Sequence, residues 1–268
     1  MAITAPGDVM LVPNPSYPIH PYGFMIAGGT LRHLPTLHDG KFKPEEYMRS
    51  LSRAVAHSVP KPVALVVSFP SNPTAQLCDI DFYKELISFA KKNNLWILSD
   101  LAYAEIYFDG NPPPSILQVN GAKEVAVEFT SLSKTFSMPG WRMGFAVGNS
   151  RLIDALTRIK SYLDYGAFTP IQVAAATALN GETDCIASIR DTYKSRRNTL
   201  IDSMDRIGWT IPSPPATMFA WAPLPIKFQK IGSMAFSKIL LQEASVAVSP
   251  GIGFGEYGEG FVRLGLVE

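Results

Sequence analysis

The chain has 268 residues, 24 Lys and Arg residues against 23 Asp and Glu residues, a formal net charge of +1 and 47% hydrophobic residues. Such a balance argues against nucleic acid or an anionic membrane surface as the main partner, because either needs clustered basic residues. The hydrophobic content excludes a disordered chain, and no apolar stretch is long enough to span a bilayer. With only Cys78 and Cys185 and no disulfide framework implied, we expect a soluble cytoplasmic globular protein.

The first half of the chain alternates apolar strands with amphipathic helices. Residues 63–69 form a β-branched run that is apolar on both faces, which is typical of a strand in a covered parallel sheet. Apolar residues at helical spacing then predict a helix over residues 79–94. Further strands are predicted at residues 95–98, 125–130 and 143–147. The alternation predicts an α/β fold.

The second half of the chain is mostly helical and then changes to short strands. Helices are predicted at residues 150–165, 170–179, 182–207 and 232–243, and strands around residues 217–221, 246–249 and 261–266. This pattern predicts a smaller α+β domain over residues 166–268, behind a larger domain over residues 1–165.

The segment 130–144, TSLSKTFSMPGWRMG, carries the clearest chemistry. Lysines are usually solvated surface residues, but Lys134 lies between two predicted apolar strands. Burial would lower the pKa of its amine, so that the neutral form could attack a carbonyl carbon. The hydroxyls of Ser131 and Ser133 and the guanidinium of Arg142 could bind a phosphate beside it.

This run of residues resembles the pyridoxal-phosphate attachment site of class I/II aminotransferases, which have the fold-type I architecture. The resemblance covers essentially the whole chain, and residues 158–170, RIKSYLDYGAFTP, are most similar to bacterial alanine (glutamate–pyruvate) aminotransferases. It implies a three-layer, mainly parallel large domain, pyridoxal 5'-phosphate as the cofactor and no metal ion. It also implies amino acid and 2-oxo acid substrates, a homodimer and a role in amino-acid biosynthesis.

By this resemblance, Lys134 binds the cofactor covalently and moves the substrate proton, while Ser131 and Arg142 hold the phosphate. Asp100, at the end of the predicted strand 95–98, would pair with the pyridinium nitrogen. From spacing alone, a turn or cap role explains Asp100 better than a functional one. Tyr103 would donate to the phenolate oxygen of the cofactor, although it could also be a packing tyrosine.

Three further residues receive roles from the resemblance. Asn72, in the turn Ser-Asn-Pro-Thr, would donate to the same phenolate oxygen and help to bind substrate, although turn chemistry alone also explains it. Tyr17 would stack on the cofactor ring, and His20 would hydrogen-bond Asp100 unless it is a satisfied structural histidine. Ala75 stands where the family usually has Gly, which puts the local loop conformation in question.

Arg263 lies in the otherwise apolar run 261–264, where burying a guanidinium is costly unless an anion meets it. By resemblance it clamps the substrate α-carboxylate, and a structural salt bridge is the alternative. The glycine-rich run 251–258 partly imitates a dinucleotide-binding loop, but no helix is predicted after it, so we interpret it as a plain loop.

Several functions stay open at this point. The expected one is transamination between alanine or pyruvate and glutamate or 2-oxoglutarate. The alternatives are LL-diaminopimelate, aspartate or aromatic transamination, β-elimination on the same fold, and a catalytically silent protein of aminotransferase shape. The family also has a phosphate-binding helix before the Tyr17 segment and a final helix after the Arg263 strand. We find neither in this sequence, so we expect a chain truncated at both ends that binds its cofactor weakly.

Overall fold

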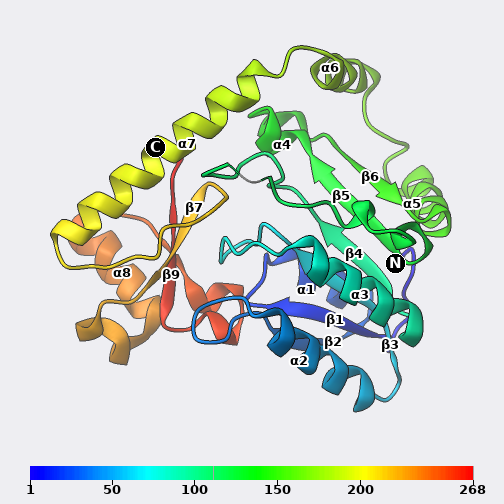
Figure 1. The fold of residues 1–268 in the computed structure, drawn as a ribbon, viewed down its shortest axis with the longest axis horizontal. Coiled ribbons are helices and arrows are strands. Elements are labelled where there is room, and N and C mark those ends of the chain that lie inside the picture. The colour runs from blue at the N-terminus through cyan, green and yellow to red at the C-terminus, as the bar shows by residue number, and fades with distance from the viewer. Residues whose placement is uncertain (111, 268) are drawn as a thin grey trace.

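The computed structural model of the chain describes residues 1–110 and 112–267; Glu268, the last residue of the predicted small domain, lies outside them. Within the described residues the strands form a six-stranded sheet and a three-stranded sheet (Figure 1). Of the helices in this part of the chain, none combines the length and the apolar character needed to cross a membrane.

The six-stranded sheet confirms the predicted α/β fold. Its strand order is β2-β1-β3-β4-β5-β6; neighbours are parallel except β6, which runs antiparallel to β5. The strands are β1 (Val9–Asn14), β2 (Thr30–Pro35), β3 (Pro62–Ser68), β4 (Trp96–Asp100), β5 (Ala126–Ser131) and β6 (Gly144–Gly148). The sheet is therefore mainly parallel, with one antiparallel edge.

Helices cover both faces of this sheet. The first helices are α1 (Ile19–Ile26), α2 (Pro44–Ala56), α3 (Ile80–Asn93), the single-turn α4 (Leu132–Thr135) and α5 (Ser150–Leu163). On one face, Leu51 of α2 and Leu86 of α3 belong to the same buried cluster as Leu65 of β3 and Ile97 of β4. On the other face lies α1, separated from β4 and β5 by a cavity of about 420 Å³.

Most predicted elements of this half appear within about two residues of their expected ends, because their local signals are strong. Asp79 begins α3 by accepting a hydrogen bond from the Phe82 amide at 2.8 Å, and Asn94 ends it in the left-handed conformation, with φ of 53°. The elements β1, α1, β2 and α2, for which no prediction is made above, fill the first quarter of the chain.

The second half contains α6 (Thr169–Asn180), α7 (Asp184–Arg206), α8 (Gly232–Ala244) and the three-stranded sheet in the order β7-β9-β8. Its strands are β7 (Phe219–Pro223), β8 (Ser249–Pro250) and β9 (Phe261–Gly265). In Figure 1, α7 runs from α6 toward this small sheet. The division into domains at residues 165 and 166 stays a prediction.

Two strands of this half begin two to three residues later than predicted. The strand expected at residues 217–221 begins only at Phe219, because Thr217 has φ of 75° and its amide donates to the Ile106 carbonyl at 2.8 Å. The strand expected at residues 246–249 begins only at Ser249, because the Val246 amide closes the end of α8 on the Leu240 carbonyl at 3.1 Å. In both cases the backbone amide of a β-branched residue, which would suit a strand, makes its hydrogen bond outside the strand.

Hydrogen bonds and ion pairs join helix α7 to the segment that follows β4. Arg190 donates to the Glu105 carboxylate at 3.1 Å and to its carbonyl at 3.0 Å. Farther along α7, Arg197 and Lys194 bind the two carboxylate oxygens of Asp109 at 2.8 and 3.0 Å. The segment after β4 is thereby held against the second half of the chain.

Candidate active site

A cavity of about 460 Å³ lies between the end of the large sheet and the small sheet. Parallel strands present their carboxyl ends at one edge, where ligands bind in open α/β sheets. The cavity is lined by every residue predicted above for the site except His20, which lies behind Asp100. The lining comprises Tyr17, Asn72, Asp100, Ala102, Tyr103, Ser131, Ser133, Lys134, Arg142, Met218, Phe219, Arg263, Gly265 and Val267.

Lys134 is half-buried on the single turn of α4, directly after β5. The turn begins at Ser131, whose hydroxyl accepts a hydrogen bond from the Ser133 amide at 3.1 Å. Burial, and then the positive charges of Arg142 and Arg263, lower the pKa of the Lys134 amine. The neutral, nucleophilic form of this amine is therefore more populated than on a free lysine.

Asp100 ends β4 with both carboxylate oxygens engaged. His20, only 8% exposed on α1, has its Nε2 2.8 Å from Asp100 Oδ2, and an ionised carboxylate can only accept. The Ala102 amide donates to the other oxygen, Oδ1, at 3.1 Å. These two bonds fix the orientation of the carboxylate at the wall of the cavity.

Tyr103 and Asn72 are both buried at the same wall. Burial raises the pKa of the Tyr103 hydroxyl to about 12, against the opposing effects of the Arg263 charge and of a hydrogen bond with Asn72. The phenol is therefore a hydrogen-bond donor at neutral pH. Two neutral donors thus stand close together at this part of the cavity.

Arg263 lies at the centre of β9 with a guanidinium that is half-buried. Within the described residues its hydrogen-bond partners are neutral: Nη1 donates to Asn72 Oδ1 at 2.8 Å, and Nη2 donates to Ser249 Oγ at 3.4 Å. Its guanidinium also lies 5.1 Å from the ring centre of Phe219 and 4.8 Å from that of Phe254. A half-buried cation with neutral partners favours binding of an anionic ligand from the cavity.

Two predicted residues lie at the more open rim. Arg142 is exposed, with φ of 51°, and uses one N–H group on the Pro139 carbonyl at 2.9 Å. Tyr17 is 44% exposed and contacts the His20 ring edge-on, with 5.8 Å between ring centres. Both side chains line the cavity and leave polar or aromatic surface facing it.

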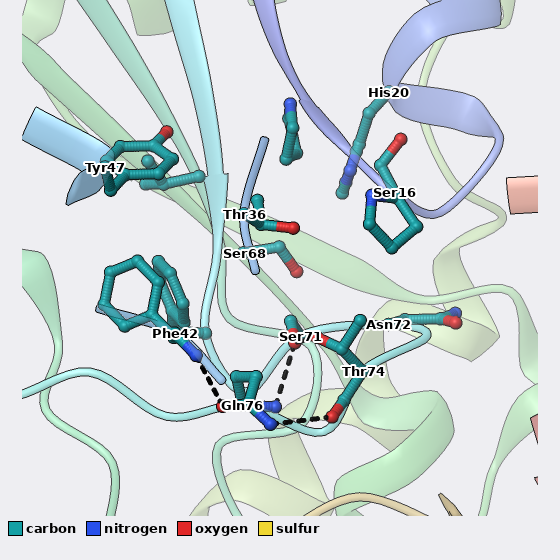
Figure 2. A pocket seen from close by; sticks show the side chains of 14 residues that line it. Ser16, His20, Thr36, Phe42, Tyr47, Ser68, Ser71, Asn72, Thr74 and Gln76 are labelled. Carbon is teal, nitrogen blue, oxygen red and sulfur yellow. Dashed lines mark hydrogen bonds between the residues drawn. The ribbon is translucent and has the colours of Figure 1, made fainter. Parts of the chain in front are cut away.

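Hydrogen bonds of Gln76 stabilise the turn that carries Asn72, as Figure 2 shows. The Gln76 amide donates to Ser71 Oγ at 3.0 Å, and the Gln76 side chain donates to the Thr74 carbonyl at 3.3 Å. The Gln76 side chain also accepts from the Phe42 amide at 3.0 Å. Asn72 points away from these bonds, so the bracing leaves its amide free to meet Arg263.

The sequence patterns miss several residues of this site. Phe219 and Met218 form part of the wall, while Phe254 lies under Arg263 without lining the cavity. Phe254 belongs to the glycine-rich run, whose role in the structure is close packing. A β-carbon on Gly255, with φ of 121°, would lie 2.3 Å from Asn14 Oδ1. Runs of apolar and glycine residues of this kind give no sequence signal for a site.

A family model described as "Aminotransferase class I and II" matches residues 1–267. Among curated relatives, AatC of Rhizobium meliloti (strain 1021) is 62% identical over 267 residues, covering 100% of this chain. Glutamate-pyruvate aminotransferase AlaC of Escherichia coli (strain K12) is 49% identical over 98% of it. An LL-diaminopimelate aminotransferase of Natranaerobius thermophilus is 43% identical over 99% of it. The chain spans 65%, 62% and 67% of the lengths of these relatives.

Solved structures give the same fold. BacF of Bacillus subtilis matches with a TM-score of 0.92 and 34% identity, covering 100% of this chain and 69% of its own. An aromatic aminotransferase of Pyrococcus horikoshii OT3 matches with a TM-score of 0.91 and 29% identity, covering 100% of this chain and 70% of its own.

Proposed function

Because the chain belongs to the class I and II aminotransferases, we propose that it moves an amino group between an L-amino acid and a 2-oxo acid, with pyridoxal 5'-phosphate as its cofactor. Fold alone does not determine chemistry, so the proposal depends on the site. The observation that carries it is the convergence of Lys134, Asp100 and Arg263 on one cavity.

The donor set around the cavity fits pyridoxal phosphate. The Lys134 amine, with its lowered pKa, suits an aldehyde carbon. The oriented Asp100 carboxylate suits a protonated ring nitrogen. Ser131, Ser133 and Arg142 line the same cavity and would hold the phosphate. The cavity volume, about 460 Å³, lies within the range of small-molecule sites.

Other residues would orient the cofactor ring. Tyr17 would stack on one face of it, and Tyr103 and Asn72 would donate to its phenolate oxygen. His20 acts from behind by holding Asp100. Of these four residues, Tyr17, Tyr103 and Asn72 line the cavity.

Bound pyridoxal phosphate supplies an electron-withdrawing ring that takes up the electron pair left on the substrate α-carbon when its proton is removed. Arg263 would bind the α-carboxylate through two N–H groups, and Asn72 would assist it. Nζ of Lys134 would accept the α-proton in its neutral form. Catalysis by this chain would thus combine an arginine that binds the substrate carboxylate with a lysine base whose pKa is lowered.

For the substrates, we favour alanine or pyruvate with glutamate or 2-oxoglutarate. The likeness to AlaC supports this choice, and the apolar Met218 and Val267 at the cavity wall suit a small apolar side chain. LL-diaminopimelate transamination is the second candidate, supported by the likeness to the enzyme of Natranaerobius thermophilus. A place in amino-acid biosynthesis fits either substrate pair.

We also infer a homodimer in the cytoplasm. Exposed apolar side chains on α5, on α6 and between them support association, as the residue Tyr165, 91% exposed, illustrates. Both cysteines, Cys78 and Cys185, are free thiols, which suits a reducing compartment.

The first test is cofactor attachment. Purified protein given pyridoxal phosphate is expected to develop a visible absorption band, and borohydride reduction should then leave a mass increase on the peptide that contains Lys134. Lys134→Ala should lack both signals, because Lys134 is the one lysine among the described residues that line the cavity. Lys238→Ala, at an exposed lysine, is the matched control and should behave as the wild type. Absence of the band in the wild type would contradict the proposal.

The second test separates the candidate substrates. In single-turnover experiments the loaded protein is mixed with L-alanine, LL-diaminopimelate, L-aspartate or L-phenylalanine, and the 2-oxo acid product is measured. Fastest conversion of L-alanine to pyruvate is expected. If the cofactor binds but no amino acid is converted, the protein is the catalytically silent alternative.

A further inference from the structure

Ala75 has a backbone conformation that favours glycine. Its φ is 56°, in the left-handed region where a β-carbon crowds the following carbonyl oxygen. Ala75 is also only 1% exposed, and Thr217 is the other buried non-glycine residue with positive φ among those described. The Thr217 hydroxyl donates to the Phe219 carbonyl at 3.1 Å, which helps to hold that residue. The side chain of Ala75 offers only a methyl group.

The turn around Ala75 does not need this methyl group. The Ala75 amide donates to the Ser71 carbonyl at 2.9 Å. The side chains of Ser71, Thr74 and Gln76 make further hydrogen bonds in the turn; Figure 2 shows those of Gln76. Glycine at position 75 would make the same backbone bond without the left-handed strain. Another interaction must therefore offset the strain that alanine introduces.

The methyl group lies among residues of the candidate site. Ala75, Tyr103 and Phe219 form one buried cluster, in which the Tyr103 ring meets Phe219 edge-on with 5.4 Å between ring centres. Tyr103 lines the same cavity as Asn72, and Phe219 lies beneath the guanidinium of Arg263. The packing around Ala75 is thus connected to three polar groups that face the cavity.

We propose that Ala75 is a positioning residue, whose methyl group fixes the Tyr103 ring and thereby places the Tyr103 hydroxyl beside Asn72. The favourable contact in the cluster offsets the cost of the left-handed conformation. The role assigned to the hydroxyl rests on the proposed function, whereas the placement of the ring does not. Removing the methyl group should therefore loosen the ring without unfolding the chain.

The placement is tested on the apoprotein labelled with 3-fluorotyrosine, by ¹⁹F NMR. The Tyr103 resonance is assigned by its loss in Tyr103→Phe. In Ala75→Gly this resonance should shift and broaden or split, whereas Ala75→Ser, which restores a β-carbon, should keep the wild-type signal. Ser245→Gly is the matched control, because Ser245 has φ of 57° at the exposed end of α8. It relieves the same strain and should leave the resonance unchanged.

The role in the site is tested on the protein loaded with pyridoxal phosphate. Ala75→Gly is expected to lower kcat by roughly 10-fold at nearly constant KM, because small misplacements of site groups are costly. Ala75→Gly should also raise the pH at which the visible band of the bound cofactor changes. The Tyr103 hydroxyl, when it is less well placed, stabilises the unprotonated form of the bound cofactor less well. Ala75→Ser and Ser245→Gly should show neither change.

An unchanged Tyr103 resonance in Ala75→Gly, or an Ala75→Ser spectrum that matches that of Ala75→Gly, would overturn the proposal. Both results are read without cofactor. If the wild type forms no visible band, the proposed function fails, while the NMR comparison still decides whether Ala75 places Tyr103. If the resonance moves but kcat and the band do not, the positioning role in the reaction is overturned.

Discussion

The charges of individual residues determine which ligands the candidate site favours. Lys134, Arg142 and Arg263 line one cavity, and Asp100 is the acidic residue in that lining. Because Asp100 is already bound by His20 and the Ala102 amide, it does not pair with these cations. The cavity therefore has an excess of positive charge, which adds to burial in lowering the pKa of Lys134 and favours ligands that carry carboxylate or phosphate groups.

Arg263→Lys tests whether the guanidinium acts as a two-pronged clamp. Lysine keeps the positive charge but loses the paired N–H geometry. The resulting fall in kcat/KM for the amino acid should correspond to a loss of about 1.5–3 kcal/mol in transition-state binding free energy. Steady-state kinetics of the loaded protein measure this loss. Arg49→Lys, at an exposed arginine paired with Glu46, is the control and should leave kcat/KM unchanged. A clamp role is wrong if Arg263→Lys behaves like the control.

At the scale of elements, α7 holds the segment after β4 through buried and exposed charges. Arg197 is buried, lies 4.7 Å over the Phe108 ring and binds Asp109. Hydrogen bonds from Arg197 and Lys194 lower the pKa of Asp109 to about 2. The same segment contains Tyr103, so this contact connects the second half of the chain to the site.

Asp109→Asn should lower the free energy of unfolding at neutral pH by about 1 kcal/mol, since the carboxylate is exposed but its partner Arg197 is buried. The pKa of Asp109 is depressed in the folded state. Its stabilisation is therefore full above the unfolded value near 4 and disappears as the pH falls toward 2. Urea unfolding of both proteins across this range should show their difference shrinking. Asp164→Asn, in an exposed pair with Lys160, should cost less; a pH-independent difference would contradict this account.

At the scale of the whole molecule, much apolar surface is left uncovered on one side. The edge strand β6 exposes Phe145 and Val147, and the segment from the end of α5 into α6 exposes Tyr162, Leu163, Tyr165, Phe168 and Val173. Many exposed apolar side chains on neighbouring segments are typical of association sites. This surface is the physical basis for the homodimer that we propose.

Phe168→Ser should weaken the proposed dimer, because it removes a side chain that is 71% exposed in the single chain and would be buried on association. Sedimentation velocity at micromolar concentration should show a dimer for the wild type and a larger monomer fraction for the variant. Ile226→Ser, at an 87% exposed residue near the small sheet, is the control and should sediment as the wild type. If the wild type and both variants sediment as equally populated dimers, the interface lies elsewhere.

The sequence by itself determined most elements from β3 onward and the chemically distinctive residues. Hydrophobic period and caps predicted the core strands and α3, because these signals act within a few residues along the chain. Lys134 and Arg263 stood out because a charged residue beside or within an apolar strand demands an explanation, whereas Asp100 received its role from the family resemblance. The fold class followed from the alternation of elements, and the structure confirms it.

Only the tertiary structure decided how distant segments meet. The bond between Arg263 and Asn72 joins residues 191 positions apart, and Phe254 comes under Arg263 from a glycine-rich run without any signal of its own. The ends of β7 and β8 depend on backbone bonds made by Thr217 and Val246, which local apolar character does not reveal. Such contacts depend on topology and packing, since neighbours in space are not neighbours in sequence. The left-handed Ala75 belongs with them, because its methyl group has a purpose only where Tyr103 and Phe219 converge.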